Sequence, residues 1–195
     1  MLEMRSRTLI ATGFTLIELM VTLAILAILM AVATPNFTTY QRNSELTSIT
    51  NSLVAAINSA RGEAMKRGRY AMVVPVDKEN WSNGWVVFVD IDRSQDYDSS
   101  TDDILILERE AVPVYVTVSG NGSSAAAEPY LMFDPVGYPK TKDGGFSSVS
   151  ISIARNDVSS DQIDAETRRI ILSSAGRVRS CRPAADSTCT STAIQ

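Results

Sequence analysis

The feature that most constrains this chain is an apolar run over residues 14–33, which contains one charged residue, Glu18. A helix rises about 1.5 Å per residue, so a helix over this run would cover roughly 30 Å, the thickness of the hydrocarbon core of a bilayer. Arg5 and Arg7 precede the run. Positive charge on this side predicts that the first residues stay in the cytoplasm while the rest of the chain crosses the membrane.

Two ordinary explanations of this run leave part of it unexplained. A secretory signal peptide could be cut after Ala33, because small residues stand at positions 31 and 33. The run is longer than the usual apolar region of such peptides, about 7–15 residues, and it contains a glutamate. A plain signal anchor gives Glu18 no role, although a carboxylate in lipid costs a few kcal/mol and therefore usually marks function.

A third explanation accounts for the glutamate. Residues 13–19, GFTLIEL, resemble the processing site of type IV pilins and of the pseudopilins of type II secretion. The resemblance implies cleavage between Gly13 and Phe14 by a prepilin peptidase, followed by N-methylation of Phe14. It also implies that Glu18 pairs with the N-terminal amine of a neighbouring subunit during assembly. Two groups that are each costly in lipid are tolerated better as a pair, so such pairing would favour the filament over the bilayer.

The segment after the apolar run continues as a helix. Pro35 also fits the pilin resemblance, and its missing N–H predicts a kink in the helix. Beyond it, apolar residues recur at steps of three and four and predict an amphipathic helix that packs on a core. They are Leu46, Ile49, Leu53, Ala56, Ile57, Ala60 and Ala64. Lys66 and Arg67 suit the negative end of a helix, and Gly68 is expected to stop it.

After Gly68 the pattern changes to short apolar and β-branched runs separated by turn residues, which predict strands. The expected strands are residues 70–76, 84–91, 104–107, 114–118, 130–133, 149–154 and 170–172. A long helix followed by short strands predicts an α+β fold in which antiparallel sheets pack on the helix. The strand order stays open.

The expected organisation has four parts. Residues 1–13 form a prepilin leader, 14–35 a transmembrane or filament-core helix, 36–68 an amphipathic helix, and 69–195 a β-rich globular domain. Three internal motifs are similar to those of the GspH/FimT group of minor pilins and pseudopilins. They are GWVVF at 84–88 before an aspartate-rich loop, FDPVG at 133–137, and a late strand that ends in Gly176 and Arg177. This resemblance implies a type IV pilin-like fold.

The composition argues against an enzyme. The chain has no histidine, which removes the commonest general base and the commonest metal ligand. It also lacks a phosphate-binding Walker loop and the G-x-S-x-G motif of serine hydrolases. An anchored periplasmic enzyme is therefore the least supported alternative, and no cofactor is expected apart from the calcium considered next.

An aspartate-rich segment follows the GWVVF motif. Asp90, Asp92 and Asp96 stand at alternate positions with Ser94 and Asp98, and oxygens spaced in this way can fold around Ca²⁺. The segment lacks the glycine and the closing glutamate of an EF-hand loop. We therefore expect a solvated acidic hairpin tip, with a calcium site as the alternative.

The two cysteines, Cys181 and Cys189, lie close together near the C-terminus. In an exported protein such a pair predicts a disulfide, whose short loop of about nine residues would contribute roughly 2–3 kcal/mol. A metal site built from two thiols without histidine is the weaker alternative.

Arginines gather at the same end of the chain. Arg177 and Arg179 are two residues apart and would share one face of a strand, with Arg182 nearby. Guanidinium groups in this arrangement can bind phosphates in a bidentate manner. Residues 176–179, GRVR, resemble the GRxR motif of FimT-type minor pilins, which implies DNA binding for uptake. The alternative is that these arginines pair with acids on this subunit or a neighbouring one.

Together these features predict a non-enzymatic minor pilin or pseudopilin that acts in assembly or priming of a type IV pilus or of a type II secretion pseudopilus. The alternative function is DNA binding during uptake. The expected partners are other pilin subunits, the prepilin peptidase, the inner membrane and, in the alternative, DNA. The expected location is the inner membrane, with a single pass and a periplasmic C-terminal domain, and then the filament. Which of the two machines is served stays open.

Overall fold

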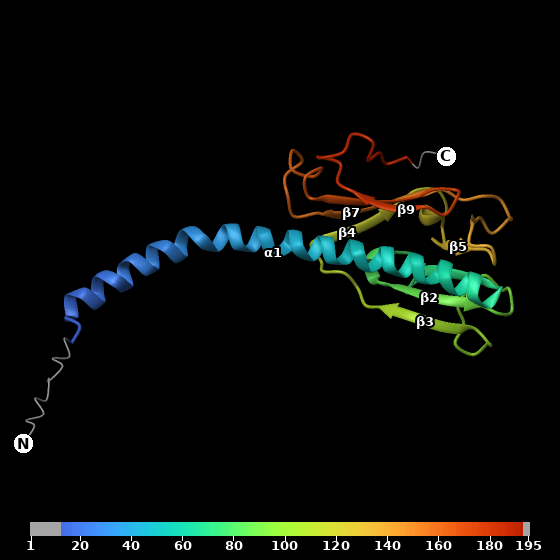
Figure 1. The fold of residues 1–195 in the computed structure, drawn as a ribbon, viewed down its shortest axis with the longest axis horizontal. Helices are drawn as coiled ribbons and strands as arrows, with labels where there is room; N and C mark the ends of the chain where they lie inside the picture. The colour runs from blue at the N-terminus through green and yellow to red at the C-terminus, as the bar shows by residue number, and fades with distance from the viewer. Residues whose placement is uncertain (1–12, 193–195) are drawn as a thin grey trace, which may run out of the picture. The chain divides into compact units, whose positions relative to one another are not determined.

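The computed structural model describes residues 13–192, apart from the side chains of residues 32–36. The chain divides into two compact units, Met1–Arg42 and Asn43–Gln195. Helix α1 (Leu16–Arg67) contributes residues to both units (Figure 1). Apart from Gly13, the expected leader lies outside the described residues, and the kink at Pro35 stays a prediction. Within the described part of the chain, no helical stretch is both apolar and long enough to cross a membrane.

Helix α1 ends where the sequence predicts. Gly68 adopts a positive φ of 64°, which is easily accessible only to glycine. The N–H of Arg69 then donates to the carbonyl oxygen of Ala64 at 3.2 Å. This is the hydrogen bond of a Schellman cap, and it satisfies one of the carbonyl groups that the end of a helix leaves without a partner.

Two antiparallel sheets follow the helix (Figure 1). The first has the order β3-β2-β1-β5-β6 and the second has the order β4-β7-β8-β9. The strands of the first sheet are β1 (Tyr70–Pro75), β2 (Trp85–Asp90), β3 (Ile104–Arg109), β5 (Leu131–Phe133) and β6 (Pro139–Lys140). Those of the second are β4 (Val116–Gly120), β7 (Val149–Arg155), β8 (Thr167–Leu172) and β9 (Val178–Cys181). Two short 3-10 helices, η1 (Trp81–Asn83) and η2 (Gly122–Ala125), lie in the connections.

The C-terminal part of α1 packs against both sheets and forms one core with them. The seven apolar helix positions predicted to face a core are buried, with exposed fractions of 0–1%. They contact inward-facing residues of both sheets, including Val87 and Phe133 of the first and Ile151 and Ile170 of the second. Burial of each large aliphatic side chain is worth about 1.5–3 kcal/mol. The predicted α+β fold, with a helix packed on antiparallel sheets, is confirmed.

A second, smaller cluster lies on the outer face of the first sheet. It contains Met72, Val74, Val86, Phe88, Tyr130 and Met132. Tyr97, from the loop between β2 and β3, packs on Phe88 with ring centroids 5.3 Å apart. Tyr97 therefore anchors the aspartate-rich loop to the sheet, while Asp92, Asp96 and Asp98 stay exposed, as expected for a solvated hairpin tip. This contact covers Phe88 on the outer face of β2, while Trp85, Val87 and Val89 of the same strand belong to the main core.

Each of the seven predicted segments overlaps a strand in the described part of the chain, but the predictions miss β6 and β9. Strand β4 starts two residues later than the predicted segment 114–118. A turn closed by a 2.8 Å hydrogen bond from the N–H of Val116 to the carbonyl oxygen of Pro113 occupies those positions. Apolar residues in this turn resemble a strand in the sequence, but the turn determines where the ladder begins.

Candidate functional sites

The predicted processing site lies at the start of α1. Gly13 and Phe14 are exposed, and an added Cβ at Gly13 would meet no atom within 4 Å. The N–H of Glu18 donates to Oγ1 of Thr15 at 3.3 Å, and the N–H of Thr15 donates to Oε2 of Glu18 at 3.4 Å. These reciprocal bonds form a capping box, in which Thr15 is the N-cap. Sequence reasoning assigned Glu18 to assembly and missed this local role, although the T-x-x-E spacing signals it.

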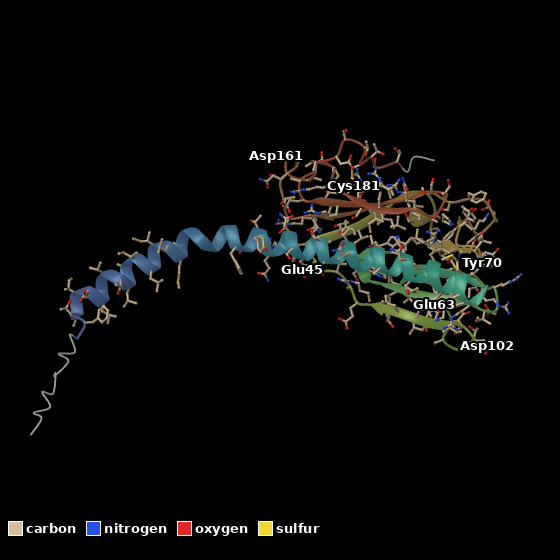
Figure 2. All side chains as sticks on the ribbon, in the orientation of Figure 1. Glu45, Glu63, Tyr70, Asp102, Asp161 and Cys181 are labelled. Carbon is tan, nitrogen blue, oxygen red and sulfur yellow. A yellow bond between two sulfur atoms is a disulfide. The ribbon has the colours of Figure 1, made fainter. Side chains whose placement is uncertain are left out.

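The first turns of α1 carry apolar side chains around the whole helix. The large apolar residues from Phe14 to Met30 are all exposed, with fractions from 48% to 81%. Figure 2 shows side chains projecting outward along this stretch of the helix. A helix that is apolar all round is stable only where lipid or protein surrounds it. This segment therefore requires an apolar environment that the isolated chain does not provide.

The C-terminal arginines are presented by a tight turn between β8 and β9. The N–H of Gly176 donates to the carbonyl oxygen of Ser173 at 2.8 Å, and Gly176 has a φ of 80°. Its own carbonyl oxygen accepts a 2.9 Å hydrogen bond from Nη1 of Arg61 on α1. A Cβ at this position would lie 2.9 Å from the carbonyl oxygen of Gly137. Only glycine fits both the backbone conformation and this close approach.

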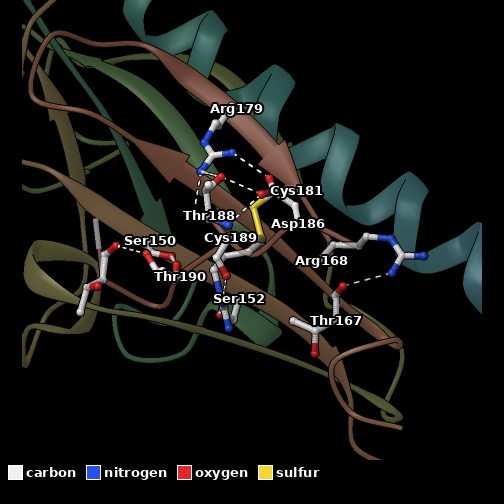
Figure 3. Close-up of a disulfide and its surroundings, with 12 residues drawn as sticks. Ser150, Ser152, Thr167, Arg168, Arg179, Cys181, Asp186, Thr188, Cys189 and Thr190 are labelled. Carbon is white, nitrogen blue, oxygen red and sulfur yellow. Dashed lines mark hydrogen bonds and ion pairs between the residues drawn. A yellow bond between two sulfur atoms is a disulfide. The ribbon is translucent and has the colours of Figure 1, made fainter. Parts of the chain in front are cut away.

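Arg177 and Arg179 lie together, but they do not share a strand as predicted, because Arg177 belongs to the turn before β9 and Arg179 lies within β9. They line a shallow pocket of about 120 Å³ with Ile171 and Ser173. Within the described part of the chain, no residue accepts a hydrogen bond from the exposed Arg177 guanidinium. Arg179 forms an ion pair with Asp186 at 3.1 Å and donates to the carbonyl oxygen of Thr188 at 2.8 Å (Figure 3). Hydrogen bonds from Thr188, and then the charge of Arg179, lower the pKa of Asp186.

Arg182 lies away from this pocket. Its Nε donates to the carbonyl oxygen of Ala165 at 2.9 Å. Burial lowers the pKa of the Arg168 guanidinium, and the positive charge of Arg182 lowers that pKa further. The predicted cluster of three arginines is therefore a pair, Arg177 and Arg179, with Arg182 on a different part of the surface.

Two further arginines near the C-terminus, Arg168 and Arg169, form hydrogen bonds within the folded domain. Arg168 donates to Oδ1 of Asn43 on α1 at 3.0 Å, and Nδ2 of Asn43 donates to Oε1 of Glu166 at 2.9 Å. Glu166 also pairs with Arg155 at 3.3 Å, and both of these charged residues are buried. Arg169 donates from Nη1 to the carbonyl oxygen of Cys189. These contacts support the interpretation that some of the C-terminal arginines pair within their own subunit.

The predicted disulfide between Cys181 and Cys189 is confirmed (Figure 3). It joins the end of β9 to the following tail, with the two Cα atoms 5.8 Å apart. Cys189 is buried, and its N–H donates to the carbonyl oxygen of Asp186 at 3.0 Å. The bridge therefore holds the loop that supplies Asp186 to Arg179.

The aspartate-rich loop brings together a different set of carboxylates from the predicted one. One oxygen from each of Asp90, Asp92 and Asp103 lies within 4.8 Å of the others. Asp96 instead forms an ion pair with Lys78 at 2.5 Å, because an opposite charge lies within its reach. Burial, followed by the negative charges of Asp103 and Asp92, raises the pKa of Asp90.

The pairing of the strands explains the position of Asp103. Val89 of β2 pairs with Ile104 of β3. Asp90 follows Val89 and Asp103 precedes Ile104, so these two aspartates lie opposite each other where the loop leaves the two strands. Sequence reasoning weighed only the alternating aspartates along the chain. The sequence carries no signal for this pairing, because an irregularity between Val87 and Phe88 shifts the register of the hairpin.

The chain matches two protein families. Residues 50–176 match the family described as type II transport protein GspH, and residues 11–34 match the prokaryotic N-terminal methylation motif. The first match covers more than half of the chain and includes both sheets as far as the turn at Gly176. No curated protein sequence matches the chain.

Similar folds occur among solved structures. Two crystal structures of the type IV minor pilin FimU of Pseudomonas aeruginosa are 18% and 17% identical to the chain, each with a TM-score of 0.51. The similar regions cover 70% and 71% of this chain and 87% and 94% of FimU. The minor pseudopilin EpsH of the Vibrio cholerae type 2 secretion system is 13% identical, with a TM-score of 0.48 over 71% of this chain and 98% of EpsH. The chain therefore belongs to the GspH family of minor pilins and pseudopilins, which are structural subunits and not enzymes.

Proposed function

We propose that this chain is a minor pilin or pseudopilin that acts in the assembly or priming of a type IV pilus or a type II secretion pseudopilus. The observation that carries the proposal is the order of features in one chain. A methylation motif at residues 11–34 overlaps the start of α1, and the same helix continues into the GspH domain at 50–176. This order suits a subunit that is inserted into a filament by its N-terminal helix.

The maturation steps follow from this proposal. A prepilin peptidase cleaves between Gly13 and Phe14, and Phe14 is then N-methylated. Before assembly, the mature subunit is anchored in the inner membrane by residues 14–35, which cross it once. Its C-terminal domain then lies in the periplasm. The helix moves from lipid to the filament core when it joins other pilin subunits. The exposed apolar residues from Phe14 to Met30 support both environments, because each covers them with apolar groups.

Glu18 directs this transfer. Its carboxylate caps its own helix in the isolated chain, through long hydrogen bonds of 3.3–3.4 Å with Thr15. A negative charge surrounded by apolar groups gains more from a positive partner than from a hydroxyl group. We therefore propose that Glu18 pairs with the N-terminal amine of a neighbouring subunit in the filament.

The capping box allows a test that separates this charge pair from helix capping. Glu18→Gln keeps an acceptor for the N–H of Thr15 but removes the charge, whereas Thr15→Ala removes the N-cap hydroxyl but keeps the charge. We expect Glu18→Gln and Glu18→Val to be cleaved and inserted in the membrane but lost from sheared filaments. Thr15→Ala should be incorporated almost as well as wild type.

The readout is the amount of subunit in membrane and filament fractions, compared at equal expression. Incorporation of Glu18→Gln at the wild-type level would contradict the charge pair. Loss of Thr15→Ala together with Glu18→Gln would assign the effect to capping instead. Filaments assembled to the normal extent in a strain without the subunit would contradict the role in assembly or priming.

DNA binding is a second candidate function, and the exposed Arg177 beside the partly buried Arg179 on one pocket favours it. Arg177 is available to a phosphate, while Arg179 already has a partner in Asp186. Contacts to phosphates would make the binding indifferent to sequence and steeply dependent on salt, with a slope of log K against log salt of about −0.9 per contact.

The test is a gel shift of the full chain in detergent with duplex DNA, at salt concentrations from about 50 to 200 mM. Arg177→Gln combined with Arg179→Gln should reduce the salt slope by about one unit, because Arg177 is the member of the pair that is available to a phosphate. Arg69→Gln, which removes an exposed arginine outside the pair, is the matched control and should leave the slope unchanged. Absence of binding at the lowest salt, or equal binding by the double variant, would contradict this function.

A further inference from the structure

We propose that the loop between β2 and β3 binds a calcium ion through the carboxylates of Asp90, Asp92 and Asp103. One oxygen from each lies within 4.8 Å of the others, so one ion can reach all three. The donor set consists of oxygens only, without histidine or thiolate, and this is the set that hard cations such as Ca²⁺ bind. The inference is independent of the filament role and of the arginine pair.

Asp90 supplies the observation that separates this site from an ordinary acidic loop. Its side chain is 1% exposed, and Oδ2 accepts a 3.2 Å hydrogen bond from the N–H of Gln95. Its other oxygen, Oδ1, is buried and has no hydrogen-bond partner among the described residues. A buried carboxylate oxygen without a partner is costly, and two further carboxylates beside it add repulsion. A cation at this point would compensate for both.

The backbone of the loop orients the three carboxylates. Oδ1 of Asp92 accepts from the N–H of Ser94 at 2.9 Å, and Oδ1 of Asp103 accepts from the N–H of Ile91 at 3.0 Å. Asp92 therefore uses one oxygen to fix the loop and has a second for an ion. Asp92 is exposed and Asp103 is partly exposed, so solvent water can supply the remaining ligands of the six to eight that Ca²⁺ takes.

Calcium fits this site better than magnesium. Magnesium demands a near-octahedral shell at short distances, whereas calcium accepts irregular sets of carboxylates and waters. A site at the mouth of a hairpin, with waters in its shell, is expected to bind in the range of about 10⁻⁴–10⁻³ M that is typical of extracellular modules. The bound ion would hold the loop, and with it Tyr97, against the outer face of the first sheet.

The experiment uses the full chain in detergent micelles, treated with EDTA and then dialysed free of it. Calorimetric titration with calcium chloride up to about 10 mM should show one ion per chain and a raised melting temperature. Magnesium chloride should bind more weakly. Asp103→Asn should weaken calcium binding by about tenfold or more, because affinity depends on the number of charged ligands.

Two further variants make the result decisive. Asp102→Asn removes the neighbouring exposed carboxylate, which is labelled in Figure 2, and should leave calcium affinity unchanged. Asp90→Asn keeps an acceptor for the N–H of Gln95, so it should fold at least as stably as wild type without calcium and yet lose binding. The proposal is overturned by absence of calcium binding in the wild type, by tighter binding of magnesium than of calcium, by wild-type affinity in Asp103→Asn or Asp90→Asn, or by equal loss in Asp102→Asn.

Discussion

Arg61 on the central helix donates a 2.9 Å hydrogen bond to the carbonyl oxygen of Gly176, 115 residues later in the chain. This bond holds the turn against the surface of the helix, and the turn carries Arg177. The same turn packs against Gly137, whose carbonyl oxygen would lie 2.9 Å from a Cβ at position 176. The position of the exposed Arg177 therefore depends on close packing around Gly176.

Gly176→Ala should destabilise the domain by about 3 kcal/mol, because it adds a clash with a backbone atom to the strain of a positive φ. Gly144→Ala is the matched control, since Gly144 has a φ of 89° but no atom within 4 Å of an added Cβ. It should cost only about 1–2 kcal/mol. Urea unfolding followed by tryptophan fluorescence measures both values, and equal losses would show that packing at position 176 contributes nothing.

Processing gives a prediction about the mature N-terminus. Mass spectrometry of the membrane-bound protein should find a chain that begins at methylated Phe14. Gly13→Val should block cleavage, because a branched side chain then occupies the position next to the scissile bond, whereas Gly62→Val on the exposed side of the helix should be cleaved normally. A mature chain that begins at Thr34 would instead indicate an ordinary signal peptide.

The buried network around Glu166 predicts a large loss of stability. Glu166→Ala would remove one partner of Asn43 and one partner of the buried Arg155. We expect a loss of about 2–4 kcal/mol, since a buried charge that loses part of its pairing is costly. Asp161→Ala is the control, because Asp161 is exposed, and its effect should stay within about 0.5 kcal/mol. Similar unfolding midpoints for the two variants would contradict this role.

A shortened chain that begins at Thr38 should fold on its own, because the core residues of α1 start at Leu46 and both sheets follow them. Replacing Cys181 and Cys189 by serine should lower its stability by about 2–3 kcal/mol, the entropy of closing a short loop. Circular dichroism and urea titration measure the change. Free thiols in protein isolated from the periplasm would contradict the bridge.

The features that sequence reasoning found are local ones. The seven apolar positions of α1 and the stop at Gly68 depend on spacing and on one backbone conformation, and the structure confirms both. Arg177 and Arg179 line one pocket because they are two residues apart in the chain, although only Arg179 lies in a strand. Such patterns can be read within a few residues of the chain.

The features that it missed depend on residues far apart in the sequence. Asp103 joins Asp90 because of strand register, and an irregularity between Val87 and Phe88 shifts that register within the hairpin. Arg168 donates to Asn43, which lies 125 residues earlier in the chain. Neither relationship leaves a periodic signal, so only the tertiary structure reveals which charges are committed to the fold.

The shared core of helix and sheets also has a consequence for the order in which the chain becomes available to fold. Residues of α1 leave the ribosome before the strands do. Ile170 and Leu172 of β8, which pack in the same core as the apolar residues of α1, are made more than 100 residues later. Until β8 arrives, one side of the apolar stripe from Leu46 to Ala64 stays open to solvent or to other chains. The central helix is thus the earliest part of the core to be synthesised and the last to be enclosed.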